Sequence, residues 1–222
     1  MLKPRKRLSK REIKEDPLVT KYVQVKQFWL HHQKEFNIIL GVIALVVIVG
    51  FLMIRSKKSA EVQASSKLAI PETYYHLRNY ERSIPELETI VEQYPGTHSA
   101  GMAVFFLANA YYDQNEYDKA NDYYDIYLDD YSDDNIFIAS SLAGKAACME
   151  NEEKYQRAAE LYFKAVKKFP DLFTSPYNVM NAIRCYKFAG LYDKAKELSK
   201  YIINKYPGTP IEKKAEYFVK VL

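Results

Sequence analysis

Residues 116–120 read EYDKA, and this short block recurs three times at nearly constant spacing. The other copies are NYERS at 79–83, KYQRA at 154–158 and LYDKA at 191–195, so their tyrosines lie 37, 38 and 37 residues apart. Fifteen residues after each tyrosine stands a residue that is a helix-stopping proline in three of four copies: Pro95, Ser132, Pro170 and Pro207. A fixed period of about 20–50 residues indicates a stacked array of similar units.

The second copy shows how each unit divides into two helices. Apolar residues share one face of a first helix: Leu107, Ala108 and Tyr111. After a turn at 114–116, others share one face of a second helix: Ala120, Tyr124 and Tyr127. Spacings of three and four residues are typical of amphipathic helices. Alanine fits where two helices of a hairpin cross closely, and larger side chains fill the remaining gaps.

This pattern resembles the tetratricopeptide repeat family. The residues that carry the resemblance are Ala108, Tyr111, Tyr117, Ala120 and Tyr124; Ala146, Tyr155, Ala158, Tyr162, Ala165 and Pro170; and Tyr186, Tyr192, Ala195 and Pro207. The resemblance covers about residues 64–222, and the period is a few residues longer than the family's. It implies an all-α fold, a solenoid of about four helix pairs with a capping helix at 211–222.

The first copy departs most from the family pattern. Ser83 and Ile90 replace two alanines. Pro71 and Pro85 fall inside the expected helices, where proline removes a backbone hydrogen bond. We therefore expect the first helix of this copy to be irregular.

A second informative stretch, NIILGVIALVVIVGFLMI at residues 37–54, is apolar on all sides. Residues 36–54 would form about 28 Å of helix, close to the thickness of a hydrocarbon core. A cleaved signal peptide is the alternative, but the run starts late and ends in Arg55 without a small-residue cleavage site. We expect one transmembrane helix at 36–54, a helical stalk at 55–66 and a repeat domain at 67–222.

The segment before this helix, residues 1–35, is expected to be a basic tail and an amphipathic juxtamembrane helix. Residues 1–15 form a basic run that is solvated or contacts anionic lipid, without the interleaved aromatics of a specific nucleic-acid site. Asp16-Pro17 reads as a helix start. The apolar face that follows comprises Leu18, Tyr22, Val25 and Trp29. It would lie in the headgroup layer or dock on another membrane protein, so residues 1–54 are the expected lipid contacts.

Charge predicts the orientation of the anchor. Residues 1–35 carry ten Lys/Arg and four Asp/Glu, whereas residues 55–222 carry 22 and 24. Because basic segments resist translocation, this favours a single-pass inner-membrane protein with a cytoplasmic N-terminus and a periplasmic repeat domain. The nearest flanks point the other way, with three basic residues before the span and four after it. An inverted, cytosol-facing topology therefore stays open.

The sequence contains no motif that predicts an enzyme, a cofactor or a metal site. The histidines do not pair with Cys, Asp or Glu at ligand spacing: His31, His32, His76 and His98. Cys148 and Cys185 occupy equivalent places in consecutive units, too far apart for a disulfide. We expect two free, buried thiols.

The second unit carries an acidic face at helical spacing, formed by Asp118, Asp122, Asp125 and Asp129. The interpretations are a solvated outer face or a docking patch for a basic partner. A calcium loop fits less well, because 129–135 lacks the glycine and distal glutamate of an EF-hand.

The resemblance also implies a concave groove, lined by first helices, that holds a peptide or a partner's helix. The corresponding residues here are Met102, Phe105, Asn109, Tyr112, Tyr177, Met180, Asn181 and Arg184. The alternative for Met102 and Met180 is ordinary packing. The family's carboxylate-clamp variant is not matched, because Phe105 and Met180 stand where lysine would be needed.

An anchor followed by such an array is similar in architecture to the ancillary subunit of the bacterial SecYEG translocon, a periplasmic chaperone-like protein that works with a membrane-anchored prolyl isomerase. The resemblance implies a scaffold that binds protein partners beside the membrane: the translocon, a membrane-anchored chaperone or unfolded segments. The alternatives are an outer-envelope assembly factor and, with inverted topology, a cytosol-facing recruitment or import receptor.

Overall fold

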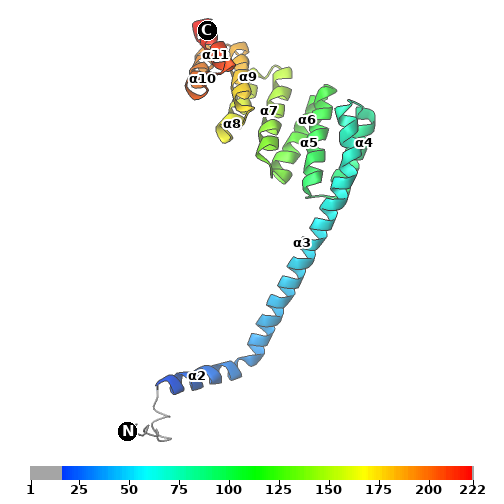
Figure 1. Ribbon diagram of the computed structural model, residues 1–222, viewed down its shortest axis with the longest axis vertical. Coiled ribbons are helices and arrows are strands. Elements are labelled where there is room, and N and C mark those ends of the chain that lie inside the picture. The colour runs from blue at the N-terminus through cyan, green and yellow to red at the C-terminus, as the bar shows by residue number, and fades with distance from the viewer. Residues whose placement is uncertain (1–16, 222) are drawn as a thin grey trace, which may run out of the picture. The chain divides into compact units, whose positions relative to one another are not determined.

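The computed structural model describes residues 17–221, which form helices and turns without a β-strand. The basic run at 1–15 and Asp16 lie outside these residues. The chain divides into two compact units, residues 1–56 and 57–222. The first unit contains α2 (Pro17–His31) and the start of α3 (Gln33–His76), which meet at a bend at His32 (Figure 1). The rings of Trp29 and Phe36 stack across this bend at 4.7 Å.

Helix α3 is long and continuous through 44 residues. Its apolar stretch from Ile38 to Ile54 is exposed along its length, apart from the half-buried Gly50. It is the one helix in residues 17–221 that is long and apolar enough to cross a membrane. The polar segment at 55–66 continues the same helix, and Ala64 and Leu68 of α3 are already buried in the second unit.

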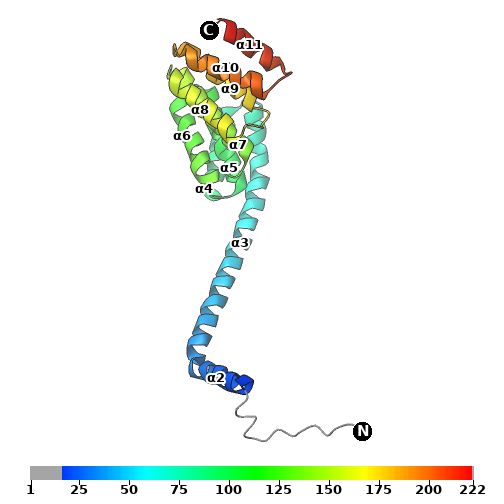
Figure 2. The same ribbon diagram turned by 90° about the vertical axis from the view of Figure 1, so that its left-hand side faces the viewer.

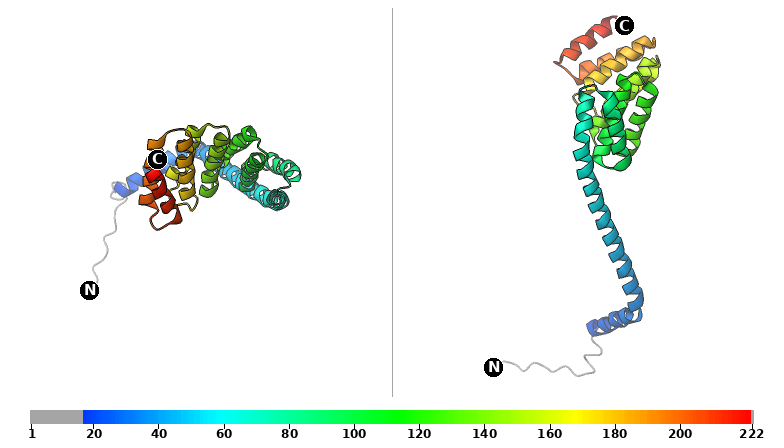
Figure 3. Two further views of the ribbon diagram at one scale, coloured as in Figure 1. Left: turned by 90° about the horizontal axis from the view of Figure 1, so that it is seen from above. Right: turned by 90° about the vertical axis from the view of Figure 1, so that its right-hand side faces the viewer.

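The second unit contains four successive helix pairs and a final helix. Their bounds are α4 (Tyr80–Gln93), α5 (His98–Asp113), α6 (Tyr117–Ile126) with the π-helical extension η1 (Tyr127–Tyr131), α7 (Asn135–Asn151), α8 (Tyr155–Lys168), α9 (Ser175–Phe188), α10 (Tyr192–Lys205) and α11 (Pro210–Val221). The end of α3 pairs with α4, and each later pair follows in chain order (Figures 1 and 3). The expected all-α solenoid with about four helix pairs and a capping helix is confirmed.

The turn inside each helix pair is the same in all four units. The residue in the left-handed region is Arg78, Asn115, Glu153 or Gly190, with φ of 57°, 64°, 60° and 73°. The next amide bonds the carbonyl five residues earlier, as from Glu116 to Tyr111 at 2.9 Å. This six-to-one bond belongs to a Schellman C-cap, which ends the first helix. The second helix begins two residues after the left-handed residue.

Two of the connections between units share the sequence Tyr-Pro-Gly-Thr, at 94–97 and 206–209. The glycine has φ of 69° or 77°, a conformation that L side chains rarely adopt. The threonine hydroxyl accepts from an amide of the next helix, Ala100 N at 3.1 Å or Glu212 N at 3.3 Å. These N-caps set where α5 and α11 begin.

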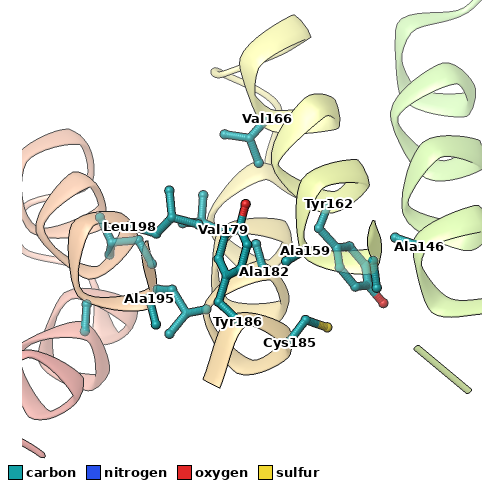
Figure 4. Close-up of a cluster of buried hydrophobic side chains, with 14 residues drawn as sticks. Ala146, Ala159, Tyr162, Val166, Val179, Ala182, Cys185, Tyr186, Ala195 and Leu198 are labelled. Atoms are coloured by element: carbon teal, nitrogen blue, oxygen red, sulfur yellow. The ribbon is translucent and has the colours of Figure 1, made fainter. Parts of the chain in front are cut away.

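Small residues allow the close helix contacts in the core. Alanines of α7, α8, α9 and α10 are fully buried beside one large ring per hairpin, as Figure 4 shows for Tyr162 and Tyr186. The N-terminal half contains the equivalent cluster around Leu107, Ala120 and Tyr124. The faces predicted from the second copy are therefore the buried faces.

The first helix of the first unit is regular, contrary to expectation. Pro71 lies inside α3. Its missing N–H leaves the carbonyl of Lys67 without its usual partner, but Lys67 is exposed and water can bond that carbonyl. Ser83, where the pattern has alanine, is fully buried and donates its hydroxyl to the Pro71 carbonyl at 2.8 Å. The serine is thus both small enough for the helix crossing and satisfied as a polar group.

Candidate functional site

Three successive units line a cavity of about 300 Å³, the central cavity. Its walls come from α5, α7 and α9, with two tyrosines from α6 and α8: Phe105, Asn109, Tyr112, Tyr124, Ser140, Ala143, Gly144, Ala147, Tyr162, Thr174, Asn178 and Asn181. No lining side chain is formally charged. The surface offers aromatic rings, hydroxyls and amides, which suit an uncharged and partly apolar ligand.

Tyr124 enters this cavity because Gly144 faces it. A Cβ atom on Gly144 would lie 2.5 Å from the Tyr124 hydroxyl oxygen and 2.6 Å from Cε2. The ring is 2% exposed, and its hydroxyl donates to Asn109 Oδ1 at 2.7 Å. Asn109 Nδ2 in turn donates to the Phe105 carbonyl at 2.9 Å. The Asn109 amide is therefore held in one orientation.

Asn178 contrasts with Asn109. It begins the second turn of α9, is 6% exposed and lines the central cavity. Its backbone amide bonds the Thr174 carbonyl at 3.0 Å, but its side-chain amide has no hydrogen-bond partner in residues 17–221. Neither side-chain amide atom of Asn178 is fully enclosed, so both are accessible from the central cavity to a ligand or to water.

A second cavity, the terminal cavity, lies between α9 and α11 and has a volume of about 650 Å³. Figure 2 shows α11 beside α9 and α10 at the C-terminal end of the repeat unit. The lining residues are Tyr177, Met180, Asn181, Arg184, Ile211, Lys213, Lys214, Tyr217 and Phe218. Asn181 lines both cavities, so they adjoin along the same helix.

Arg184 holds two units together. Its Nε and Nη2 atoms donate to the two Glu150 carboxylate oxygens of α7 at 2.9 and 2.8 Å. Its Nη1 atom donates to Asn181 Oδ1 at 3.1 Å. Tyr162 donates to the same carboxylate at 3.3 Å, and burial, with the nearby Glu150 charge, raises the pKa of Tyr162. The guanidinium charge at the edge of the terminal cavity is thus already neutralised.

A tetratricopeptide repeat (TPR) model matches residues 103–134, which span most of α5, all of α6 and η1. The repeat domain has a TPR-like fold. Two crystal structures of nearly identical TPR-like repeats, from a Podosopora anserina protein described as a kinesin light chain, have a TM-score of 0.56 at 15% identity. Each match covers 71% of this chain and 83% of that chain. No curated protein matched the sequence.

The predicted groove residues fall into three groups in the structure. Phe105, Asn109 and Tyr112 line the central cavity, and Asn181 lines both cavities. Tyr177, Met180 and Arg184 line the terminal cavity. Met102 lines neither cavity and packs against the core cluster of the N-terminal half.

The sequence did not indicate that the third repeat unit and the capping helix form cavity walls. The unpredicted residues include Ser140, Ala143, Gly144, Ala147 and Asn178, and from α11 Ile211, Lys213, Lys214, Tyr217 and Phe218. Moving the predicted α9 positions back by one repeat of 37 residues gives Ser140, Ala143, Gly144 and Ala147 of α7. The position of α11 depends on tertiary packing and had no such signal.

The predicted acidic face is only partly free. Asp118, Asp122 and Asp129 are exposed on α6 and η1. Asp125 forms an ion pair with Lys145 of α7, which is 15% exposed. This carboxylate therefore links two TPR units and is less available to a partner than the other three.

Both thiols are buried, and one histidine has an acidic partner distant in the sequence. Cys148 and Cys185 are free and buried, and burial raises the pKa of each thiol to about 12. The tertiary structure places His98 Nδ1 2.8 Å from Asp133, a pair that sequence spacing did not show. Within residues 17–221, no group of three His, Cys, Asp or Glu side chains could hold a metal ion.

Proposed function

We propose that this chain is a membrane-tethered scaffold whose central cavity binds an extended segment of another protein. The observation that carries the proposal is Asn178, a buried side-chain amide that lines the cavity without a partner. An amide both donates and accepts, which matches the N–H and C=O of a peptide backbone. The aromatic rings and small alanines beside it would accommodate side chains of modest size.

The wall chemistry favours an unfolded segment over a charged ligand. No lysine, arginine, aspartate or glutamate lines the central cavity. A small charged metabolite would lose its hydration there without gaining an ionic partner. A peptide backbone needs only hydrogen bonds and apolar contact.

Removing the amide tests this proposal. The probe is a labelled polypeptide that is unfolded by reduction and alkylation with iodoacetamide. We expect Asn178→Leu to weaken its binding by about tenfold, because one buried hydrogen bond contributes about 1–1.5 kcal/mol. Fluorescence anisotropy with the full chain in detergent measures the affinity. The thermal midpoint should not fall, since Asn178 loses no internal partner.

A second variant fills the same cavity by another route. Ala147→Phe should also weaken binding, whereas Ala69→Phe, at an exposed position on α3, should leave it unchanged. Circular dichroism verifies that each variant is folded. Unchanged affinity in both Asn178→Leu and Ala147→Phe would contradict the proposal.

The proposed tether is the apolar part of α3, residues 38–54, with α2 in the headgroup layer. Tyr22, Val25 and Trp29 of α2 are all more than half exposed, which supports insertion of this face into a lipid interface. The basic excess before the span supports a cytoplasmic N-terminus and a periplasmic repeat domain. Association with a translocon or a membrane-anchored chaperone stays a prediction.

Fractionation and protease access test the tether and its direction together. We expect the chain to remain in the membrane pellet after alkaline carbonate extraction. Protease added outside intact spheroplasts should digest the repeat domain. Release by carbonate would contradict the anchor, and protection until the spheroplasts are lysed would indicate the cytosol-facing orientation.

A further inference from the structure

The terminal cavity differs in charge from the central one. Its floor is apolar, with Met180, Ile211 and Phe218 half-buried and Tyr177 and Tyr217 each 63% exposed. Two large exposed rings at the mouth of a cavity form an apolar surface that another molecule would cover.

Lysine supplies the unbalanced charge at this cavity. Of the charged lining residues, Arg184 is paired with Glu150. Lys213 and Lys214 are exposed, and no carboxylate in the described part of the chain pairs with either. Lys187 lies 6.0 Å from the Phe218 ring and adds a further cation beside the site. The cavity thus presents two free positive charges beside apolar rings.

We propose that the terminal cavity binds an acidic peptide segment that carries a large apolar side chain next to its carboxylates. The apolar side chain would insert between Tyr177 and Phe218, and the carboxylates would pair with Lys213 and Lys214. This complementarity is the reason to choose an acidic segment over a basic or neutral one. The proposal rests on the proposed function, because it names the kind of segment that the scaffold binds.

Continuity with the central cavity favours a peptide over an anionic lipid. Asn181 lines both cavities, and its Oδ1 atom accepts from Arg184, whereas its Nδ2 group has no partner in the part of the chain that the structure describes. A chain that leaves the terminal cavity past Asn181 would next meet the unpartnered Asn178 amide. A lipid headgroup would pair with the lysines but would not form hydrogen bonds along the amides of Asn181 and Asn178.

The test uses the full chain in detergent and two fluorescein-labelled peptides of ten residues. The acidic peptide contains two leucines, one phenylalanine and three carboxylates, and the control peptide has amides in place of the carboxylates. We expect the charge-reversed variant Lys213→Glu with Lys214→Glu to weaken binding of the acidic peptide by at least about tenfold, and of the amide peptide by less than about twofold. Lys220→Glu is the matched control, because Lys220 is exposed on α11 and does not line the cavity.

The outcomes separate this proposal from the proposed function. Equal binding of both peptides, or equal effects of the lysine pair and Lys220→Glu, would overturn the acidic-segment proposal. If Asn178→Leu still weakened binding of the unfolded polypeptide in that case, the proposed function would stand. Lysine-dependent binding of phosphatidylglycerol vesicles without binding of the acidic peptide would assign the cavity to lipid and would also overturn it.

Discussion

Gly144→Val should lower the free energy of unfolding by about 3 kcal/mol, the upper end of the usual cost of overpacking. A side chain at this position would collide with the buried Tyr124 ring, which could move away only into the central cavity. If the ring moved, its hydroxyl would lose Asn109 as well. Urea unfolding of the full chain in detergent, followed by circular dichroism, measures the change.

Two further variants identify the cause of that loss. Tyr124→Leu removes the ring atoms in question, so the double variant with Gly144→Val should be clearly more stable than the sum of the single effects predicts. Gly101→Ala should cost less, because its nearest neighbours are side-chain atoms of the half-buried Tyr131 at 3.0 Å. Additive single effects would show that Gly144 is not required by contact with Tyr124.

Raising the pH from about 9 to 12 should remove several kcal/mol of stability from the repeat domain. Burial raises the pKa of Cys148 and Cys185 from 9.0 to about 12. The unfolded chain therefore releases these protons first, and the stabilisation that is complete below pH 9 is lost as the pH rises through 12. Tyr123 and Tyr206, whose pKa burial also raises to about 12, add to the loss above pH 10.

The thiol contribution can be separated because it begins one pH unit below that of the tyrosines. We expect Cys148→Ala with Cys185→Ala to flatten the fall in stability between pH 9 and 10, measured as the slope of unfolding free energy against pH. Ala69→Phe, which changes no titratable group and lies at an exposed position, should leave the slope as in the wild type. Equal slopes for the wild type and the double cysteine variant would contradict the assigned role of the thiols.

Local sequence identified the repeat well because its determinants are local. The tyrosine block fixes where each second helix begins, and in every copy the left-handed turn residue directly precedes the block. Three of these four residues are not glycine: Arg78, Asn115 and Glu153. In these turns the tertiary packing of the hairpin overcomes the usual preference for glycine. The Tyr-Pro-Gly-Thr connections could have been recognised as a second motif, since they carry both a left-handed glycine and an N-cap.

The candidate site was only half predictable. Phe105, Asn109 and Asn181 are groove residues by family resemblance, and in the structure they line the central cavity; that they bind a protein stays a prediction. Met102 was not separable from them, because a half-buried face of α5 serves both core and cavity. The engagement of Arg184 by Glu150 connects residues 34 positions apart, and sequence periodicity does not specify such a side-chain pair.

The amino-acid sequence by itself determined an apolar helix long enough to span a membrane and a stack of helix pairs with a period of 37–38 residues, because both depend on patterns within a few helical turns. Only the tertiary structure decided which polar groups remain unpaired. Asn178, Lys213 and Lys214 look no different in the sequence from side chains that find partners. Their availability depends on what neighbouring helices place, or fail to place, within hydrogen-bond reach.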